Sequence, residues 1–285
     1  MKHETLLTGA PIPKIGFGTW NVGGGMSANY SQEDRSLIAL RAALEAGYTH
    51  FDTAEMYADG HAEELLARAI HATGTNRETL FLTTKVWTNH MRHQDVIHAC
   101  ENSLKRLQTD YIDLYLIHWP NDNVPLQDTF QGLNDLSRRG LARAIGVSNF
   151  DLDPLRRAQT LSETPIVTNQ VPYSLHNQRY VENGILAYCQ ENGIVLTAYT
   201  PVEKGSLANE PAVKDLARKY NATPIQIALA WLIQQPRVIT IPMSLNPAHL
   251  TENFRAAEIA LSDKDMEKLN TLSSLFRTLR KKIRL

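Results

Sequence analysis

Cysteine is scarce in this sequence, and long apolar runs are missing. Its two cysteines, Cys100 and Cys189, fall inside helix-like segments and lack the spacing of metal ligands. Neither a disulfide framework nor a zinc site is therefore indicated. The opening residues, MKHETLLTGAPIPK, carry no apolar stretch that could act as a signal peptide, and no later run has the length needed to span a bilayer. We therefore expect a cytoplasmic protein with no membrane partner.

An excess of charge of either sign is missing as well. Lysine and arginine together number 29 and aspartate and glutamate 30, which gives a formal net charge of -1. Such an even balance provides no field that would draw the chain to nucleic acid or to an anionic membrane. The expected partner is a small molecule.

The sequence does contain a regular alternation of amphipathic helices and short apolar runs. Continuous apolar strands that alternate with helices predict a parallel sheet whose faces the helices cover. Seven runs are clear strand candidates and an eighth, AEIALS, is weaker. The predicted helices cover 31–46, 58–74, 93–108 and 125–140, and the predicted strands 48–52, 79–86, 111–119, 142–150, 165–171, 193–200, 237–244 and 257–262.

Polar residues near the ends of three successive strands indicate the type of sheet. Asp52, Lys85 and His118 follow one another at intervals of 33 positions. One strand-helix unit takes about 30 residues, so the three side chains are predicted to face one another from equivalent positions on neighbouring strands. Functional residues at the carboxyl ends of several strands are typical of the (β/α)8 barrel, which takes about 250 residues.

We therefore predict an α/β fold with a single (β/α)8 TIM barrel over residues 1–285. An N-terminal β-hairpin over about 1–18 is expected to close the bottom of the barrel, and a basic, solvated tail is expected over about 273–285. A two-domain Rossmann enzyme would require G-x-G-x-x-G directly after a strand, and the glycines at 23–25 have neither that spacing nor a strand before them.

Taken singly, the three polar residues have ordinary structural explanations as a helix cap, a solvated lysine and a satisfied core histidine. Their equal spacing and the presence of Tyr57 favour one hydrogen-bonded cluster instead. A phenol with a pKa of about 10 is a poor acid near neutrality unless a nearby positive charge stabilises its anion. Lys85 is predicted to supply that charge, and Asp52 to keep Lys85 protonated.

At these residues the sequence resembles the aldo-keto reductases. FDTAEMYADGHAEELLARAI is similar to the first signature of that family, ARAIGVSNF to its second, and IPMSLNPAHLTENF to a variant of its third, and the likeness runs from GFGTW at 16–20 to ALS at 260–262. The resemblance implies an oxidoreductase that binds a nicotinamide cofactor without a Rossmann domain and reduces aldehydes or ketones to alcohols. It also implies a catalytic tetrad with Tyr57 as general acid and His118 orienting the carbonyl: Asp52, Tyr57, Lys85 and His118.

The same resemblance implies where the cofactor binds. Ser148, Asn149 and Gln170 are expected to hydrogen-bond the nicotinamide carboxamide, and Tyr199 to stack on its ring. Further contacts are expected from the first strand, from the loop that lies along the pyrophosphate and from the third signature: Gly18, Thr19, Trp20, Asp52, Thr200, Pro201, Val202, Met243, Ser244, His249, Glu252 and Asn253.

Two positions in the third signature depart from the family pattern. Met243 and His249 stand where the family commonly has the lysine and arginine that hold the 2′-phosphate of NADPH. Because a phosphate prefers charge-assisted partners, NADP(H) is the expected cofactor but discrimination against NAD(H) should be weaker than is usual in the family.

The substrate pocket is predicted to be aromatic, with residues 21–30 and 121–129 as its rim. A monomer is expected from the family. Two alternatives remain open: a cofactor-binding regulatory subunit with slow turnover, and a phosphate-binding barrel isomerase or lyase that needs no nicotinamide. The predicted pocket residues around a small carbonyl substrate are Trp20, Tyr57, Trp87, His118 and Trp119.

Overall fold

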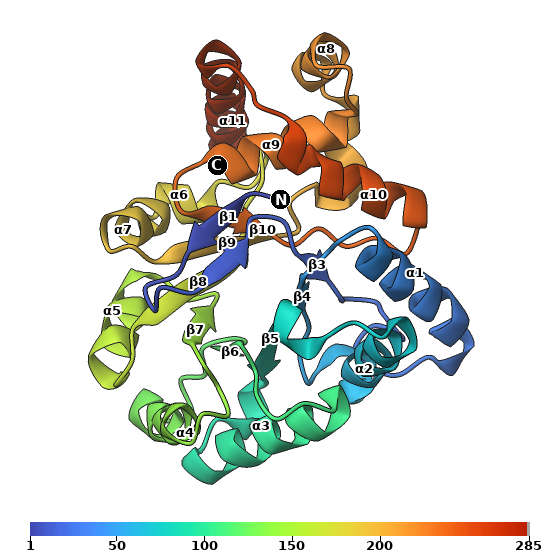
Figure 1. Ribbon diagram of the computed structural model, residues 1–285. Coiled ribbons are helices and arrows are strands. Elements are labelled where there is room, and N and C mark those ends of the chain that lie inside the picture. Colours follow the sequence, from blue (N-terminus) through green and yellow to red (C-terminus); the bar gives the residue numbers. More distant parts are fainter. Residues whose placement is uncertain (284–285) are drawn as a thin grey trace.

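Eight parallel strands form one sheet in the computed structural model (Figure 1), which describes residues 1–283 and all of their side chains except those of Lys204 and residues 275–283. The strand order is β10-β9-β8-β7-β6-β5-β4-β3, so every strand lies beside its neighbour in sequence. This order with helices outside is that of the predicted barrel. The strands are β3 Phe17–Gly18, β4 His50–Asp52, β5 Phe81–Val86, β6 Leu114–Ile117, β7 Ile145–Ser148, β8 Ile166–Pro172, β9 Val195–Tyr199 and β10 Val238–Thr240.

The barrel closes between its first and last strands. Ile15 and Thr240 form a parallel bridge, and the backbone N–H of Gly16 donates to Thr240 O at 2.8 Å. This contact pairs the two outer strands of the eight-stranded sheet with each other, and pairing of sheet edges removes a common route to aggregation.

The predicted eighth strand at 257–262 is wrong. A 3-10 turn, η6 Ala256–Glu258, occupies the start of that segment, and no strand is assigned to the rest of it. The eighth strand is β3, whose two residues are too short to show a strand pattern in sequence. The predicted hairpin is correspondingly shorter, because β3 belongs to the barrel.

The hairpin itself is present outside the barrel sheet, as predicted. Strands β1 His3–Thr5 and β2 Pro11–Pro13 pair antiparallel, with His3 opposite Pro13. Leu6 and Ile12 of this hairpin are buried against the apolar residues Phe81, Leu114, Val195 and Ile239 from the barrel strands. The hairpin therefore closes the amino-terminal end of the barrel with apolar side chains.

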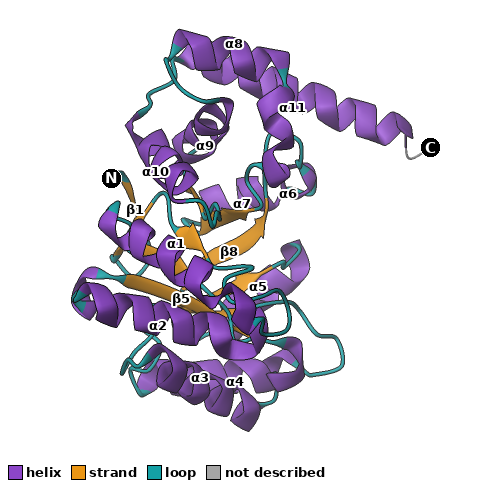
Figure 2. Ribbon diagram, turned by 90° about the vertical axis from the view of Figure 1, so that its right-hand side faces the viewer, coloured by secondary structure: helices purple, strands orange, loops and turns teal. Residues whose placement is uncertain are grey.

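Helices surround the strands on the outside of the barrel. Figure 2 shows α8 (Pro211–Lys219) and α11 (Asp263–Ile283) at the opposite end of the molecule from α3 (His93–Leu107) and α4 (Leu126–Arg138). All four predicted helices are observed, as α1 to α4. The helices are α1 Glu33–Glu45, α2 His61–Thr73, α3 His93–Leu107, α4 Leu126–Arg138, α5 Leu152–Leu161, α6 Arg179–Glu182, α7 Ile185–Glu191, α8 Pro211–Lys219, α9 Pro224–Gln234, α10 Pro247–Arg255 and α11 Asp263–Ile283.

The predicted basic tail begins within α11, but the side chains from residue 275 onward lie outside the described residues. Within the described part of the chain, no helix is both long enough and apolar enough to cross a membrane. In that same part, no group of three or more histidine, cysteine, aspartate or glutamate side chains is arranged to hold a metal ion.

Candidate active site

The strand register brings Asp52, Lys85 and His118 to one end of the barrel. Asp52 pairs with Thr83 and Lys85 with Leu116, so each functional residue lies two positions farther along its strand direction than the previous one. Strand side chains alternate between the two faces, and an offset of two therefore preserves the face. The three residues are therefore offset by two residues from each strand to the next, rather than level with one another as predicted. Their side chains still share the inner face of the barrel.

Lys85 is the centre of the resulting cluster. Its Nζ donates to Asp52 Oδ1 at 2.5 Å and to Thr53 O at 2.7 Å, and lies 3.5 Å from the hydroxyl of Tyr57. The lysine side chain has an exposed fraction of 0%. The His118 ring stands edge-on to the Tyr57 ring, with centroids 5.6 Å apart. The structure therefore brings the predicted tetrad together.

Burial and charge set the protonation of this cluster. Burial lowers the pKa of Lys85, but the adjacent Asp52 and Tyr57 together raise it above its usual value, which keeps the ammonium charged. Burial raises the pKa of Tyr57; Lys85 lowers it, as predicted, but does not outweigh burial. The phenol is therefore protonated at neutral pH.

His118 carries no charge in this setting. Burial and the positive charge of Lys85 lower its pKa to about 2. A neutral imidazole keeps one N–H donor and one acceptor nitrogen. The ring can therefore orient a carbonyl oxygen by hydrogen bonding, whereas an imidazolium acid is disfavoured here.

A strained turn carries Tyr57. In the turn η2 Tyr57–Gly60, the three residues Ala58, Asp59 and Gly60 have left-handed φ values of 51°, 54° and 86°. The N–H groups of Ala58 and Asp59 donate to Gly25 O at 2.7 Å and Met26 O at 3.1 Å. Part of the segment predicted as a pocket rim therefore holds the turn in place.

The residues predicted to bind the nicotinamide also meet. The Tyr199 hydroxyl donates to Asn149 Oδ1 at 2.9 Å, and Asn149 Nδ2 donates to His118 O at 3.1 Å. Ser148 Oγ donates to Gln170 O at 2.8 Å. These groups lie at the carboxyl ends of β7, β8 and β9, so they border the tetrad.

The remaining predicted cofactor contacts lie on β3, on the segments after β9 and β10, and on α10. A Cβ on Gly18 would lie 2.7 Å from Ile241 O, so this close approach requires glycine. Met243 and Ser244 are half-buried, His249 is exposed, and Glu252 and Asn253 follow on α10. Thr200, Pro201 and Val202 directly follow β9, ahead of the turn η5 Glu203–Asn209.

Two of the three predicted pocket tryptophans contact the tetrad. The ring centroids of Trp20 and Tyr57 are 5.1 Å apart, and those of Trp87 and His118 5.0 Å. Trp119 directly follows His118 and is 42% exposed, and Trp20 is 39% exposed. An aromatic wall therefore lies beside the phenol and the imidazole.

Glu55 was not among the predicted residues, but its side chain lies beside Trp87 at the site. Its Oε1 accepts a hydrogen bond from the Trp87 backbone N–H at 2.5 Å and lies 3.1 Å from His90 Nδ1. From the predicted rim, Asn121 Nδ2 donates to Thr88 O at 2.7 Å. The only sequence signal for Glu55 was an acid between Asp52 and Tyr57, which gives no indication of a partner more than thirty positions away.

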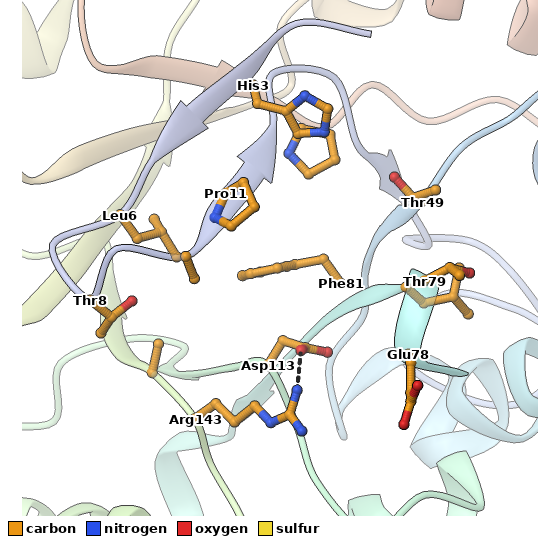
Figure 3. Close-up of a pocket in the computed structure, with 14 residues that line it drawn as sticks. His3, Leu6, Thr8, Pro11, Thr49, Glu78, Thr79, Phe81, Asp113 and Arg143 are labelled. Carbon is orange, nitrogen blue, oxygen red and sulfur yellow. Dashed lines mark ion pairs between the residues drawn. The ribbon is translucent and has the colours of Figure 1, made fainter. Parts of the chain in front are cut away.

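A separate cavity of about 310 Å³ lies at the other end of the barrel (Figure 3). It lies between the hairpin and the amino-terminal ends of barrel strands, and its lining includes Leu6, Pro11 and Phe81. Asp113 and Arg143, also in its lining, form an ion pair of 3.7 Å. None of the tetrad lines it. In such barrels this end usually serves stability and the opposite end chemistry.

Comparison with known proteins agrees with this geometry. The family model described as "Aldo/keto reductase family" matches residues 14–274. Methylglyoxal reductase YeaE of Escherichia coli (strain K12) is 37% identical over 265 residues, which cover 91% of this chain and 90% of that protein.

Solved structures agree as well. The crystal structure of the thermostable aldo-keto reductase Tm1743 with the inhibitor epalrestat has a TM-score of 0.92 and 43% sequence identity, and the match covers 95% of this chain and 100% of that one. An aldo/keto reductase from Klebsiella pneumoniae in complex with NADP and acetate has a TM-score of 0.86 and 36% identity, covering 95% of each chain. Because these matches extend over almost the whole barrel, this chain belongs to the aldo/keto reductase family of oxidoreductases, which reduce small carbonyl compounds.

Proposed function

We propose that this chain reduces aldehydes or ketones by hydride transfer from NADPH, with Tyr57 as the general acid. The observation that carries the proposal is the position of the Lys85 ammonium, 2.5 Å from Asp52 Oδ1 and 3.5 Å from the Tyr57 hydroxyl. A buried cation beside a protonated phenol stabilises the phenolate that forms when the phenol gives up its proton.

The residues at the site fit a nicotinamide cofactor. A carboxamide needs both donors and acceptors, and Asn149 and Gln170 provide both from amide groups. Gln170 Nε2 donates to Asp52 at 2.7 Å, which presents its carbonyl oxygen as an acceptor. The hydroxyl of Thr19 is buried and has no hydrogen-bond partner among the described residues. We propose that Thr19, Ser148, Asn149, Gln170 and Tyr199 hold the cofactor.

The protein's own groups then account for the proton. A bound reduced nicotinamide supplies the hydride to the carbonyl carbon. Tyr57 donates its hydroxyl proton to the carbonyl oxygen, and the neutral imidazole of His118 hydrogen-bonds that oxygen and orients it. Lys85 stabilises the phenolate, and Asp52 keeps Lys85 protonated. In alcohol oxidation the same groups act in reverse, with the phenolate as base.

The segment proposed to bind the 2′-phosphate of NADPH departs from the family pattern in this chain. Met243, a neutral thioether, and His249 stand in place of the two cations usual in the family, which leaves Ser244, the His249 imidazole and the amino end of α10 to contact the phosphate. Amides at a helix amino end bind anions, but without a fixed cation the preference for NADPH over NADH should be modest.

A small carbonyl compound fits the aromatic wall formed by Trp20 and Trp87. The relative from Escherichia coli is a methylglyoxal reductase. We propose small 2-oxoaldehydes and aromatic aldehydes as the first substrates to test. From the family resemblance we also propose a monomer that acts in the cytoplasm.

The test compares the wild type with Tyr57→Phe. Tryptophan fluorescence quenching measures the Kd for NADPH and NADH, and an aldehyde panel measures kcat. Loss of positioned acid catalysis should lower kcat by about 10²- to 10⁴-fold while the Kd for NADPH stays nearly constant. Wild-type turnover by Tyr57→Phe would remove the assigned acid. A wild type that binds NADPH tightly but reduces no aldehyde would instead favour a regulatory subunit.

A further inference from the structure

We infer that Glu63 is a positioning residue for Tyr57. Its carboxylate lies on the outer side of the barrel wall and fixes the turn that directs the phenol toward Lys85. This inference rests on the proposed role of Tyr57 as general acid.

Glu63 is a buried carboxylate that the proposed mechanism does not use. It lies in the first turn of α2 and has an exposed fraction of 0%. Thr84 Oγ1 donates to its Oε1 at 2.6 Å, and Arg106 Nε donates to its Oε2 at 2.7 Å. A buried charge persists only where it is paired and hydrogen-bonded, so this carboxylate ties α2 to both β5 and α3.

The two partners of this carboxylate connect it to the catalytic groups. Thr84 directly precedes Lys85 on β5, and consecutive strand side chains point to opposite faces. Thr84 therefore bonds Glu63 outside the barrel while Lys85 contacts Tyr57 inside it. The Thr84–Glu63 hydrogen bond therefore fixes the start of α2, six positions after Tyr57, to the strand that carries the lysine.

Arg106 acts on the turn itself. A Cβ on Gly60 would lie 2.7 Å from Cδ and Nε of Arg106, so the arginine side chain packs directly against the last residue of the turn. The left-handed backbone of Ala58 and Asp59 is unfavourable and persists only where its surroundings determine it. Hydrogen bonds from the turn to the carbonyl oxygens of residues 25 and 26 hold one side, and the Glu63–Arg106 pair holds the other.

The contact that this bracing protects is a long one. The 3.5 Å between Lys85 Nζ and the Tyr57 hydroxyl is at the limit of a hydrogen bond, so a small movement of the turn removes it. A displacement of about 1 Å at a catalytic group can lower the rate by about 10²-fold.

Asp113 provides a matched control. It is also a buried carboxylate near β5, but at the amino-terminal end of that strand, where it accepts hydrogen bonds from Arg77 at 2.6 Å and from the N–H of Leu82 at 2.9 Å. Asp113→Asn therefore removes a similar charge from the same barrel wall without touching the Tyr57 turn.

The experiment measures kcat, KM, the Kd for NADPH, the Tm and the pH dependence of kcat for Glu63→Gln and Asp113→Asn. We expect Glu63→Gln to lower kcat by about 10- to 100-fold with the Kd for NADPH unchanged. Moving Lys85 away from the phenol raises the pKa of Tyr57, so the alkaline decline of kcat should shift to higher pH. Asp113→Asn should leave kcat and the pH of its alkaline decline unchanged, even if its Tm falls as much as that of Glu63→Gln.

Thr84→Val keeps the test decisive if Glu63→Gln does not fold. It removes a single hydrogen bond and should give the same alkaline shift with a smaller loss of kcat. A wild-type kcat and pH profile in the Glu63 or Thr84 variant would overturn the inference, and so would an equal loss in Asp113→Asn at equal Tm. Tyr57→Phe separates the two proposals: if it retains turnover, the proposed acid is wrong, whereas an inactive Tyr57→Phe beside a normal Glu63→Gln rejects only the positioning role.

Discussion

Gln170 Nε2 donates a hydrogen bond of 2.7 Å to Asp52 Oδ2 across the barrel, from β8 to β4. Lys85 occupies the other oxygen of the same carboxylate at 2.5 Å. Asp52 thus joins the residues proposed to hold the nicotinamide to those proposed to move the proton. A change at this carboxylate should therefore affect stability and catalysis together.

Asp52→Asn should both destabilise the protein and slow it. Removing the charge leaves the fully buried Lys85 ammonium without its counter-ion, and breaking a buried pair in this way costs about 3–5 kcal/mol. Urea unfolding measures the free energy of unfolding, and steady-state kinetics measures kcat. Glu163→Gln, which breaks the exposed pair with Arg138, should leave both nearly unchanged. Equal stability of the two variants would contradict the assigned charge pair.

Stability should fall as the pH drops below about 6.5. Burial, with the charge of Lys85, lowers the pKa of His50 to about 3 and that of His118 to about 2. In this window the unfolded chain binds two protons that the folded chain does not, so the free energy of unfolding rises with pH. Urea unfolding at about pH 7 and about pH 5 measures the difference. His50→Asn should remove about half of this dependence, and an unchanged slope in that variant would argue against a neutral His50.

Restoring two cations should increase selectivity for NADPH. Met243→Lys combined with His249→Arg provides charge-assisted hydrogen bonds to the 2′-phosphate, each worth about 1.5–3 kcal/mol. The Kd for NADPH should fall about 10-fold or more while the Kd for NADH changes little. Met243→Leu, which changes shape but not charge, should leave the ratio as it is. A wild type that already strongly prefers NADPH, and that the double variant does not improve, would contradict the weak-discrimination prediction.

Glu55→Ala should alter substrate binding more than chemistry. The Trp87 N–H loses its acceptor at 2.5 Å, so the tryptophan beside His118 should lose its fixed position. We expect KM for an aromatic aldehyde to rise about 10-fold, with a smaller rise for a small 2-oxoaldehyde and an unchanged Kd for NADPH. His90→Ala removes the other neighbour of Glu55 and should have a weaker effect. Equal changes in KM for both aldehydes would speak against a role in shaping the pocket.

The sequence by itself determined the strand-helix alternation and the identity of the four central groups. Equal spacing of Asp52, Lys85 and His118 was sufficient to predict that they meet, because the spacing matches one strand-helix unit. The sequence pattern did not identify the eighth strand, because a strand as short as Phe17–Gly18 is defined by its neighbours and not by its own side-chain pattern.

Only the tertiary structure decided how these groups behave. The two-residue stagger and the left-handed turn after Tyr57 are visible only in the fold. The contacts of Glu55 and Glu63 likewise join segments about twenty to forty positions apart in the sequence. The neutral state of His118 and the raised pKa of Tyr57 follow from burial, which depends on the packing of the whole barrel. A sequence specifies which groups are available for chemistry, whereas their charge and orientation depend on what the fold places around them.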